Sequence, residues 1–195
     1  MSSDNNSLDL GSVESLLAKA RSEAAIEMAV LDAQLRSTET SFASYLGATR
    51  STIPSGVSVG IHDSVDDLLS TVQGYVDDGY VRIKLKIEPG WDIEPVRVIR
   101  QTLGDHVPLQ VDANTAFTRN DGPLLAQLDP FNLLLIEQPL PEDDITGHAL
   151  IAKQVATPIC LDESIVSSLA AVDAIERGAC SIINIKAGRV GGYLE

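Results

Sequence analysis

Residues 81–86 read VRIKLK and end on Lys86, the first of five short, mostly apolar runs that each lead to one charged residue. The other four runs are LQVD, NLLLIE, ICLD and IINIK, and they end at Asp112, Glu137, Asp162 and Lys186. The five charged residues follow one another at gaps of 26, 25, 25 and 24 residues. A strand and its returning helix occupy roughly 25 residues in a (β/α)₈ barrel. The spacing therefore predicts one charged residue at the end of each of five successive parallel strands.

The rest of the chain fits the same architecture. We expect strands over 56–60, 80–87, 108–114, 132–137, 158–163 and 181–186, and helices over 64–78, 92–103, 120–128, 143–156 and 166–177. Continuous apolar runs are typical of parallel strands buried on both faces, and their alternation with helices indicates βαβ units. Ser64 and Asp92 are the expected N-caps, and Gly79, Gly104 and Gly178 the expected helix stops. The fold class is α/β, a TIM-type (β/α)₈ barrel that is incomplete, with about six βα units and the last two strands absent.

The segment before the first strand has a different pattern. Residues 1–11 are polar and are expected to form a disordered leader. Apolar residues then recur at three- and four-residue steps and predict a helical segment over 12–50, with a helix over 12–47 that can break near 37–41. The expected organisation is therefore a leader, a helical segment, and a partial barrel over 51–195.

Composition limits the classes of partner. The 195 residues include 14 basic and 28 acidic side chains, a net charge of −14, which disfavours nucleic acid and anionic membrane surfaces as partners. We see no signal peptide and no apolar run of about 20 residues that would span a membrane, so we expect a cytoplasmic protein. Cys160 and Cys180 are expected to be small core residues, and His62, His106 and His148 to be surface residues.

The three strand-end acids indicate a metal site. A carboxylate at the end of a buried strand is costly unless it is paired or binds a metal. Asp112, Glu137 and Asp162 offer only oxygen ligands, which favours Mg²⁺, or Mn²⁺, over Zn²⁺. The alternative for each acid taken singly is a salt bridge or a helix N-cap. Three of them at regular strand spacing, flanked by lysines, favour the metal.

The lysines indicate a general base. Lys84 and Lys86 are two residues apart on one strand, so both point to the same face. Repulsion between them and partial desolvation are expected to lower the pKa of one toward neutrality, which suits a general base. The alternative is a solvent-facing pair on an edge strand. Lys186 is expected across the barrel mouth, so that two lysines reach opposite faces of the α-carbon of a small-molecule carboxylate substrate. A divalent cation would offset the charge of the enediolate formed by loss of the α-proton.

The motifs KLK (84–86), VDAN (111–114), IEQP (136–139), LDES (161–164) and NIKAGRVGG (184–192) resemble the enolase superfamily. Within it they are similar to the muconate-lactonizing-enzyme subgroup, above all to the o-succinylbenzoate synthases and N-acylamino acid racemases. The resemblance implies that Asp112, Glu137 and Asp162 bind Mg²⁺, that Lys86 is the base, and that Lys84 tunes it. It implies for Lys186 a role as a cation that stabilises the enediolate in a synthase, or as the second acid/base in a racemase. Ser58 corresponds to a substrate-contact position, and Asn114 and Glu163 to groups that support the site.

The resemblance implies a carbon–oxygen lyase that makes o-succinylbenzoate by syn dehydration, a step toward menaquinone. It also has gaps, because the family's α+β capping domain and the last two strands have no counterpart here. We therefore expect a fragment of a longer enzyme. Two other possibilities stay open: an N-acylamino acid racemase that uses Lys86 and Lys186 as two bases, and a non-catalytic barrel remnant that covers its open strand edges by forming a homo-oligomer.

Overall fold

The computed structural model describes residues 10–195, with side chains from Ser22 onward. These residues fall into two compact units. The first contains the described residues up to Ser51, together with Ile165–Leu169 and Ile185–Glu195, and the second contains Thr52–Ser164 and Ala170–Asn184. Residues 1–9 of the predicted leader over 1–11 lie outside the described residues. The division of the chain into a leader, a helical segment and a partial barrel stays a prediction.

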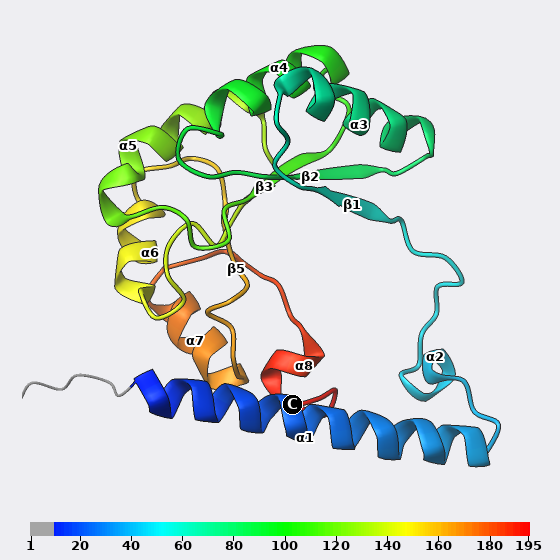
Figure 1. Cartoon of the computed structure of the whole chain (residues 1–195). Helices are drawn as coiled ribbons and strands as arrows, with labels where there is room; N and C mark the ends of the chain where they lie inside the picture. The colour runs from blue at the N-terminus through cyan, green and yellow to red at the C-terminus, as the bar shows by residue number, and fades with distance from the viewer. Residues whose placement is uncertain (1–9) are drawn as a thin grey trace, which may run out of the picture. The chain divides into compact units, whose positions relative to one another are not determined.

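The second unit is built on a six-stranded sheet in the order β1-β2-β3-β4-β5-β6 (Figure 1). Every neighbouring pair of strands is parallel. The strands are β1 (Gly56–Val59), β2 (Arg82–Lys86), β3 (Leu109–Asp112), β4 (Ile136–Glu137), β5 (Ile159–Leu161) and β6 (Ile182–Ile183). The six predicted parallel strands are therefore confirmed, although each is shorter than its apolar run. Among the described residues β1 and β6 are the two edges of this sheet.

Helices connect the strands and lie along one side of the sheet (Figure 1). They are α3 (Val65–Asp77), α4 (Ile93–Leu103), α5 (Gly122–Leu125), α6 (Ile145–Ile151) and α7 (Ser168–Glu176), with the 3₁₀ turns η1 (Arg119–Asp121) and η2 (Ala126–Phe131). Ser64 and Asp92 cap α3 and α4 as predicted, each accepting a hydrogen bond from a backbone N–H of the first turn. Gly79, Gly104 and Gly178 have positive φ after α3, α4 and α7, so the predicted stops are confirmed.

Two helices differ from prediction. The helix expected over 120–128 is split into η1, α5 and η2. Pro130, inside η2, lacks the N–H that an α-helix would need there. The helix expected over 143–156 ends at Ile151. Past that point the N–H groups of Ala156 and Thr157 donate to the Asp129 side chain, at 2.9 and 2.8 Å, instead of extending the helix.

The core of this unit lies between the sheet and its helices. Along β2 the apolar side chains of Ile83 and Leu85 are buried, and Lys84 and Lys86 alternate with them on the opposite face. Buried residues from the helices include Leu68 and Val72 of α3 and Val96 and Ile99 of α4. This alternation leaves the lysines on the face of the sheet away from the helices.

The first unit contains α1 (Leu10–Ser37), α2 (Phe42–Tyr45) and α8 (Ala187–Val190). The predicted break near 37–41 is present, and Ser41 caps α2 by accepting a hydrogen bond from the backbone N–H of Ser44. Glu27 of α1 accepts hydrogen bonds from the backbone N–H groups of Tyr193 and Leu194, at 2.6 and 3.3 Å. The C-terminal residues are thereby held on α1. No helix in the described part of the chain has the length and apolar character needed to cross a membrane.

Candidate metal and catalytic site

Three buried carboxylates follow or end neighbouring strands of the sheet. Asp112 is the last residue of β3, Glu137 is the last residue of β4, and Asp162 comes directly after β5. Their exposed fractions are only 2%, 2% and 1%. The carboxyl ends of parallel strands share one edge of the sheet, so the fold gathers these acids there. Burying ionised carboxylates is costly without compensating charge or hydrogen bonds.

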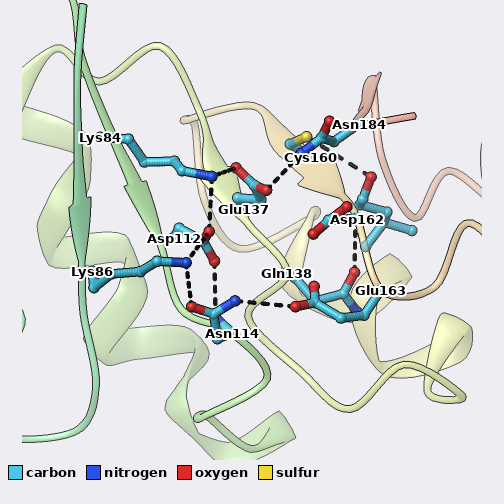
Figure 2. A network of polar contacts seen from close by, with 11 residues as sticks. Lys84, Lys86, Asp112, Asn114, Glu137, Gln138, Cys160, Asp162, Glu163 and Asn184 are labelled. Atoms are coloured by element: carbon cyan, nitrogen blue, oxygen red, sulfur yellow. Dashed lines mark hydrogen bonds and ion pairs between the residues drawn. The ribbon is translucent and has the colours of Figure 1, made fainter. Parts of the chain in front are cut away.

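Lysines from β2 supply part of that compensation (Figure 2). The Nζ of Lys84 lies 2.9 Å from Oδ2 of Asp112 and 3.1 Å from Oε2 of Glu137. The Nζ of Lys86 lies 2.7 Å from Oδ2 of Asp112. The structure therefore brings four of the predicted site residues into one ion-pair cluster. The alternative of a solvent-facing lysine pair does not fit these contacts.

The cluster changes the pKa values of Lys84 and Asp112. Burial lowers the pKa of Lys84, but its hydrogen bonds and charge attraction to Asp112 and Glu137 outweigh burial, so the pKa is raised above its ordinary value. Burial likewise acts to raise the pKa of Asp112, and the hydrogen bonds and charges of Lys86 and Lys84 lower it overall. We expected a lowered pKa for one of the two lysines, and it is not Lys84, because the carboxylates of Asp112 and Glu137 lie close to its ammonium group.

A cavity of about 310 Å³ lies on the lysine face of the sheet. All six strands contribute to its lining, which includes Ser58, Lys84, Gln110, Glu137 and Cys160. Ser58 of β1 is the register partner of Lys84, so the predicted substrate-contact residue lines the same cavity as the cluster. Two members of the ion-pair cluster, Lys84 and Glu137, therefore line this cavity.

Asn114 connects Lys86 to Glu163. Its Oδ1 accepts a hydrogen bond from Lys86, and its Nδ2 donates to Oε1 of Glu163 at 3.0 Å (Figure 2). Its backbone N–H also donates to Oδ1 of Asp112 at 3.0 Å. Oε2 of Glu163 is buried and has no hydrogen-bond partner among the described residues. Both predicted supporting residues therefore contact the cluster, directly or through one another.

The carboxylate oxygens of Asp112, Glu137 and Asp162 are the type of ligand atom that a hard divalent cation prefers. Among the side chains that the structure describes, no three His, Cys, Asp or Glu residues are arranged to hold a metal ion. Lys84 instead lies between oxygens of Asp112 and Glu137, so this part of the site already stabilises a positive charge. The nearby acids offer oxygen only, which is the ligand type that Mg²⁺ prefers. The residues are therefore suited to Mg²⁺ by chemistry, and their assignment as ligands stays a prediction.

Lys186 belongs to the other compact unit, where it is the N-cap residue of α8. Its predicted place across the barrel mouth from Lys86 stays a prediction.

Sequence reasoning missed three residues of this region. Asn184, directly after β6, donates through Nδ2 to Oε1 of Glu137 at 3.0 Å. Gln138 is fully buried next to Glu137. His148, predicted to lie on the surface, is also fully buried, so that prediction is wrong. Its position on the first turns of α6 looked exposed in the sequence, whereas the loop after β4 covers it: the backbone N–H of Leu140 donates to its Nε2 at 3.1 Å. The available signal for Gln138 was a polar residue directly after a predicted ligand, and for Asn184 a polar residue two positions before Lys186 in an otherwise apolar run.

Comparison with known families gives a match over residues 67–195 to the enolase C-terminal domain-like family. The chain is 64% identical over 187 residues to an N-succinylamino acid racemase of Amycolatopsis sp, which covers 94% of this chain and 51% of that protein. It is 49% identical over 173 residues to an o-succinylbenzoate synthase of Geobacillus kaustophilus, covering 89% and 46%. The chain thus spans about half the length of the curated relatives that it matches.

Solved structures agree on the fold. A member of the enolase superfamily from Listeria innocua superposes with a TM-score of 0.84 at 44% identity, covering 88% of this chain and 46% of that one. The L-talarate/galactarate dehydratase of Salmonella typhimurium LT2, liganded with Mg and L-lyxarohydroxamate, gives 0.81 at 30% identity, covering 90% and 46%. The six-stranded sheet therefore corresponds to an incomplete α/β barrel of this superfamily.

Proposed function

The chain belongs to the enolase C-terminal domain-like family, and from this premise we propose that it carries the metal-binding and general-base part of an active site that removes the proton α to a carboxylate. The proposed reaction is that of a Mg²⁺-dependent o-succinylbenzoate synthase. The observation that carries this proposal is the cluster of Lys84, Lys86, Asp112 and Glu137 at the carboxyl ends of adjacent strands. Relatives named o-succinylbenzoate synthase support the assignment to a lyase.

Asp112, Glu137 and Asp162 are the proposed ligands of Mg²⁺. A related dehydratase structure, described as liganded with Mg, supports the proposal of a divalent cation. When bound, the cation would supply positive charge against the enediolate that forms as the α-proton leaves. Asn184 would keep one oxygen of Glu137 oriented by its hydrogen bond.

Lys86 is the proposed base. Its Nζ contacts Asp112 and Asn114, which fix the direction of the amine beside the proposed ligands. Lys86, as the base, takes the α-proton. The ammonium group of Lys84 adds a second positive charge next to the proposed Mg²⁺ site. Lys186 is proposed to stabilise the developing negative charge from the opposite side of the substrate. The protonated Lys86 then returns this proton to the hydroxyl group on the adjacent carbon, which leaves as water as the C–C double bond forms, and this completes the syn dehydration that yields o-succinylbenzoate, on the way to menaquinone.

A second candidate function is N-succinylamino acid racemisation. The observation that favours it is the 64% identity to a racemase of that name, against 49% to a synthase. In this reaction Lys86 and Lys186 act as two bases on opposite faces of the α-carbon. Both candidates share the first step, and they differ in whether Lys186 exchanges a proton.

The test measures proton exchange as well as turnover. The purified chain is incubated with Mg²⁺ in D₂O, once with the substrate of o-succinylbenzoate synthases and once with an N-succinylamino acid of each hand, and NMR follows dehydration and α-deuteration. We expect Lys86→Ala to abolish dehydration. Under the racemase assignment, Lys186→Ala still allows exchange of one enantiomer only. Lys153→Ala, at an exposed position, is the control.

Isothermal titration with Mg²⁺ is run on the same samples. The proposed site requires binding by the wild-type chain that is lost in Asp162→Asn. A wild-type chain that binds no Mg²⁺ and exchanges no α-proton contradicts the proposal for this chain and favours a non-catalytic barrel remnant. Binding without exchange would assign to it the metal site alone.

A further inference from the structure

Gln138 occupies an unusual position directly after Glu137. It is fully buried, and its backbone has φ of 39°, a left-handed conformation that most side chains disfavour. Strain of this kind costs about 1–3 kcal/mol and persists only where surrounding contacts impose it. Glycine would suit the backbone better, so the glutamine side chain must contribute something that glycine lacks.

The Gln138 amide joins the loops that follow β4 and β5. Its Oε1 accepts hydrogen bonds from the backbone N–H groups of Asp162 and Ser164, at 2.9 and 3.2 Å. Its Nε2 donates to the hydroxyl of Ser164 at 2.7 Å and to the carbonyl of Leu140 at 3.1 Å. One side chain therefore connects the residue after Glu137 to the backbone of Asp162 itself.

The backbone of Gln138 extends the same connection. Its N–H donates to the carbonyl of Cys160 in β5 at 2.8 Å, and its carbonyl accepts from the N–H of Thr115, three residues past Asp112, at 2.9 Å. Gln138 thus contacts the segments that carry all three proposed ligands. The Leu140 loop is in turn held by His148, whose Nε2 accepts from the N–H of Leu140 and whose Nδ1 bonds the carbonyl of Asp144 at 2.9 Å.

The sheet alone does not fix Glu137 relative to Asp162. The β4–β5 ladder pairs Glu137 with Cys160, two residues before Asp162, and β4 has only two residues. Among the described residues, no ladder pair joins the two strands past this one. The hydrogen bonds from the backbone N–H groups of Asp162 and Ser164 to Gln138 begin where the ladder stops. They therefore hold the segments after β4 and β5 together, as further strand pairing would have done.

We infer that Gln138 is a positioning residue that sets the separation of the Glu137 and Asp162 carboxylates for a divalent cation. This inference rests on the proposed metal site. Groups that orient metal ligands from behind typically change metal affinity by about 10- to 100-fold when they are removed. An effect on metal affinity can be measured separately from an effect on stability, so this positioning role can be tested.

Asp129 offers a matched control at the other end of β5. Its carboxylate accepts from the N–H groups of Ala156 and Thr157 and from the Thr157 hydroxyl, at 2.9, 2.8 and 2.7 Å. Like Gln138, it ties a neighbouring segment to β5 by several hydrogen bonds. It does so before the strand begins, away from the proposed ligands. Removing either side chain should destabilise the chain, and only the loss of Gln138 should weaken metal binding.

The experiment compares two apolar isosteres, Gln138→Met and Asp129→Leu, in the full chain. Affinity for Mn²⁺ and Mg²⁺ is measured by isothermal titration calorimetry, and metal-free stability by urea unfolding. We expect Gln138→Met to weaken metal binding by at least tenfold and Asp129→Leu by less than about twofold, although both lower the unfolding midpoint. Should Gln138→Met fail to fold, Gln138→Asn replaces it, since the shorter amide does not span to residues 162 and 164.

Equal metal affinity in the Gln138 variant and wild type overturns the positioning role. Equal weakening by both variants also overturns it, because the effect would then be one of general stability. A wild-type chain without measurable metal affinity removes the proposed metal site itself, and the inference with it. The wild-type titration therefore separates failure of the premise from failure of the inference.

Discussion

The Nζ of Lys84 lies 3.1 Å from Oε2 of Glu137, although 53 residues separate the two in the chain. The same nitrogen lies 2.9 Å from Oδ2 of Asp112. One ammonium group from β2 thus bridges carboxylates from the next two strands, both of which are almost completely buried. Without that charge, two buried anions would lie side by side.

Lys84→Met should therefore destabilise the metal-free chain. Hydrogen bonds to charged groups contribute about 1.5–3 kcal/mol each, and Lys84 is partly exposed, so we expect a loss at the lower end of that range. If the acids bind Mg²⁺, added Mg²⁺ should stabilise the variant more than the wild type, because no ammonium competes for the same oxygens. Urea unfolding with and without Mg²⁺ measures both effects.

Lys153→Met is the control for this substitution, since it removes an exposed lysine. It should leave stability within about 0.5 kcal/mol of wild type and should not change the response to Mg²⁺. A Lys84 variant as stable as the control would mean that the buried carboxylates do not depend on this ion pair.

Stability should fall on mild acidification because of His148. Burial lowers the pKa of its imidazole, against a smaller opposing effect of the backbone carbonyl and charge of Asp144. The unfolded chain then takes up a proton near pH 6.5, where the folded chain does not. The His148 contribution is complete above pH 6.5 and is lost as pH falls from there toward the folded-state pKa, at up to about 1.4 kcal/mol per pH unit.

Urea unfolding between pH 7.5 and 5 checks this dependence. His148→Gln should flatten it, whereas His106→Gln, which removes an exposed imidazole, should keep it. A slope unchanged by His148→Gln would show that the imidazole is protonated in the folded chain, contrary to its contacts: protonated Nε2 has no lone pair to accept the N–H of Leu140.

Loss of the Arg100 side chain of α4 should have a large effect on stability. Its guanidinium is buried and donates to four backbone carbonyls, those of Gly104, Val107, Phe131 and Asn132, at distances between 2.7 and 3.0 Å. Arg100→Leu leaves several of these acceptors unsatisfied, at about 1–3 kcal/mol each, so we expect a total loss above about 3 kcal/mol.

Arg97, three residues earlier on the same helix, is the matched comparison. It is more exposed and pairs with Glu94 along the helix. Arg97→Leu should change stability by no more than about 1 kcal/mol, as is usual for surface ion pairs. Thermal unfolding of the two variants side by side gives the result, and similar losses would contradict the structural role assigned to Arg100.

Much of the fold was predictable because its signals are local. The apolar runs that end at Lys86, Asp112 and Glu137 coincide with strand ends, and Ser64 and Asp92 cap helices by contacts within one turn. The strands themselves are shorter than the runs, as in β4, where the apolar residues 133–135 come before the first ladder pair. The contacts of Asp129 with Ala156 and Thr157, inside and just past the helix predicted over 143–156, were not predictable, because they join segments more than twenty residues apart.

The site was predictable in its members more than in its electrostatics. Lys84 and Lys86 were expected on one face of a strand, and they are. The raised pKa of Lys84 depends on distances to Asp112 and Glu137 that no spacing rule gives. The burial of His148 and the contacts of Gln138 likewise come from loops that meet only in the folded chain. The catalytic and metal-binding roles stay predictions until they are measured.

The reactivity of the two cysteines reports whether β6 stays paired with β5. Burial raises the pKa of Cys160 to about 12, with a further contribution from the nearby charges of Glu137 and Asp162, and burial also raises the pKa of Cys180. A thiol that is both buried and protonated reacts slowly, because the thiolate is the nucleophile. We therefore expect Ellman's reagent to label neither cysteine in the native chain and both in urea.

Cys180→Ser assigns the signal to Cys160, which lies in β5 next to the edge strand β6. Slow native labelling with a rate that rises with urea would mean that exposure of Cys160 requires unfolding. Rapid labelling of Cys160 without denaturant would mean instead that β6 separates from β5 in the native chain or that the reagent enters through the cavity that Cys160 lines, and only strand separation would lower the metal affinity as well. Because Asn184 reaches Glu137 from the residue directly after β6, such opening would also release one contact of a proposed ligand, so the labelling rate and the metal affinity should change together.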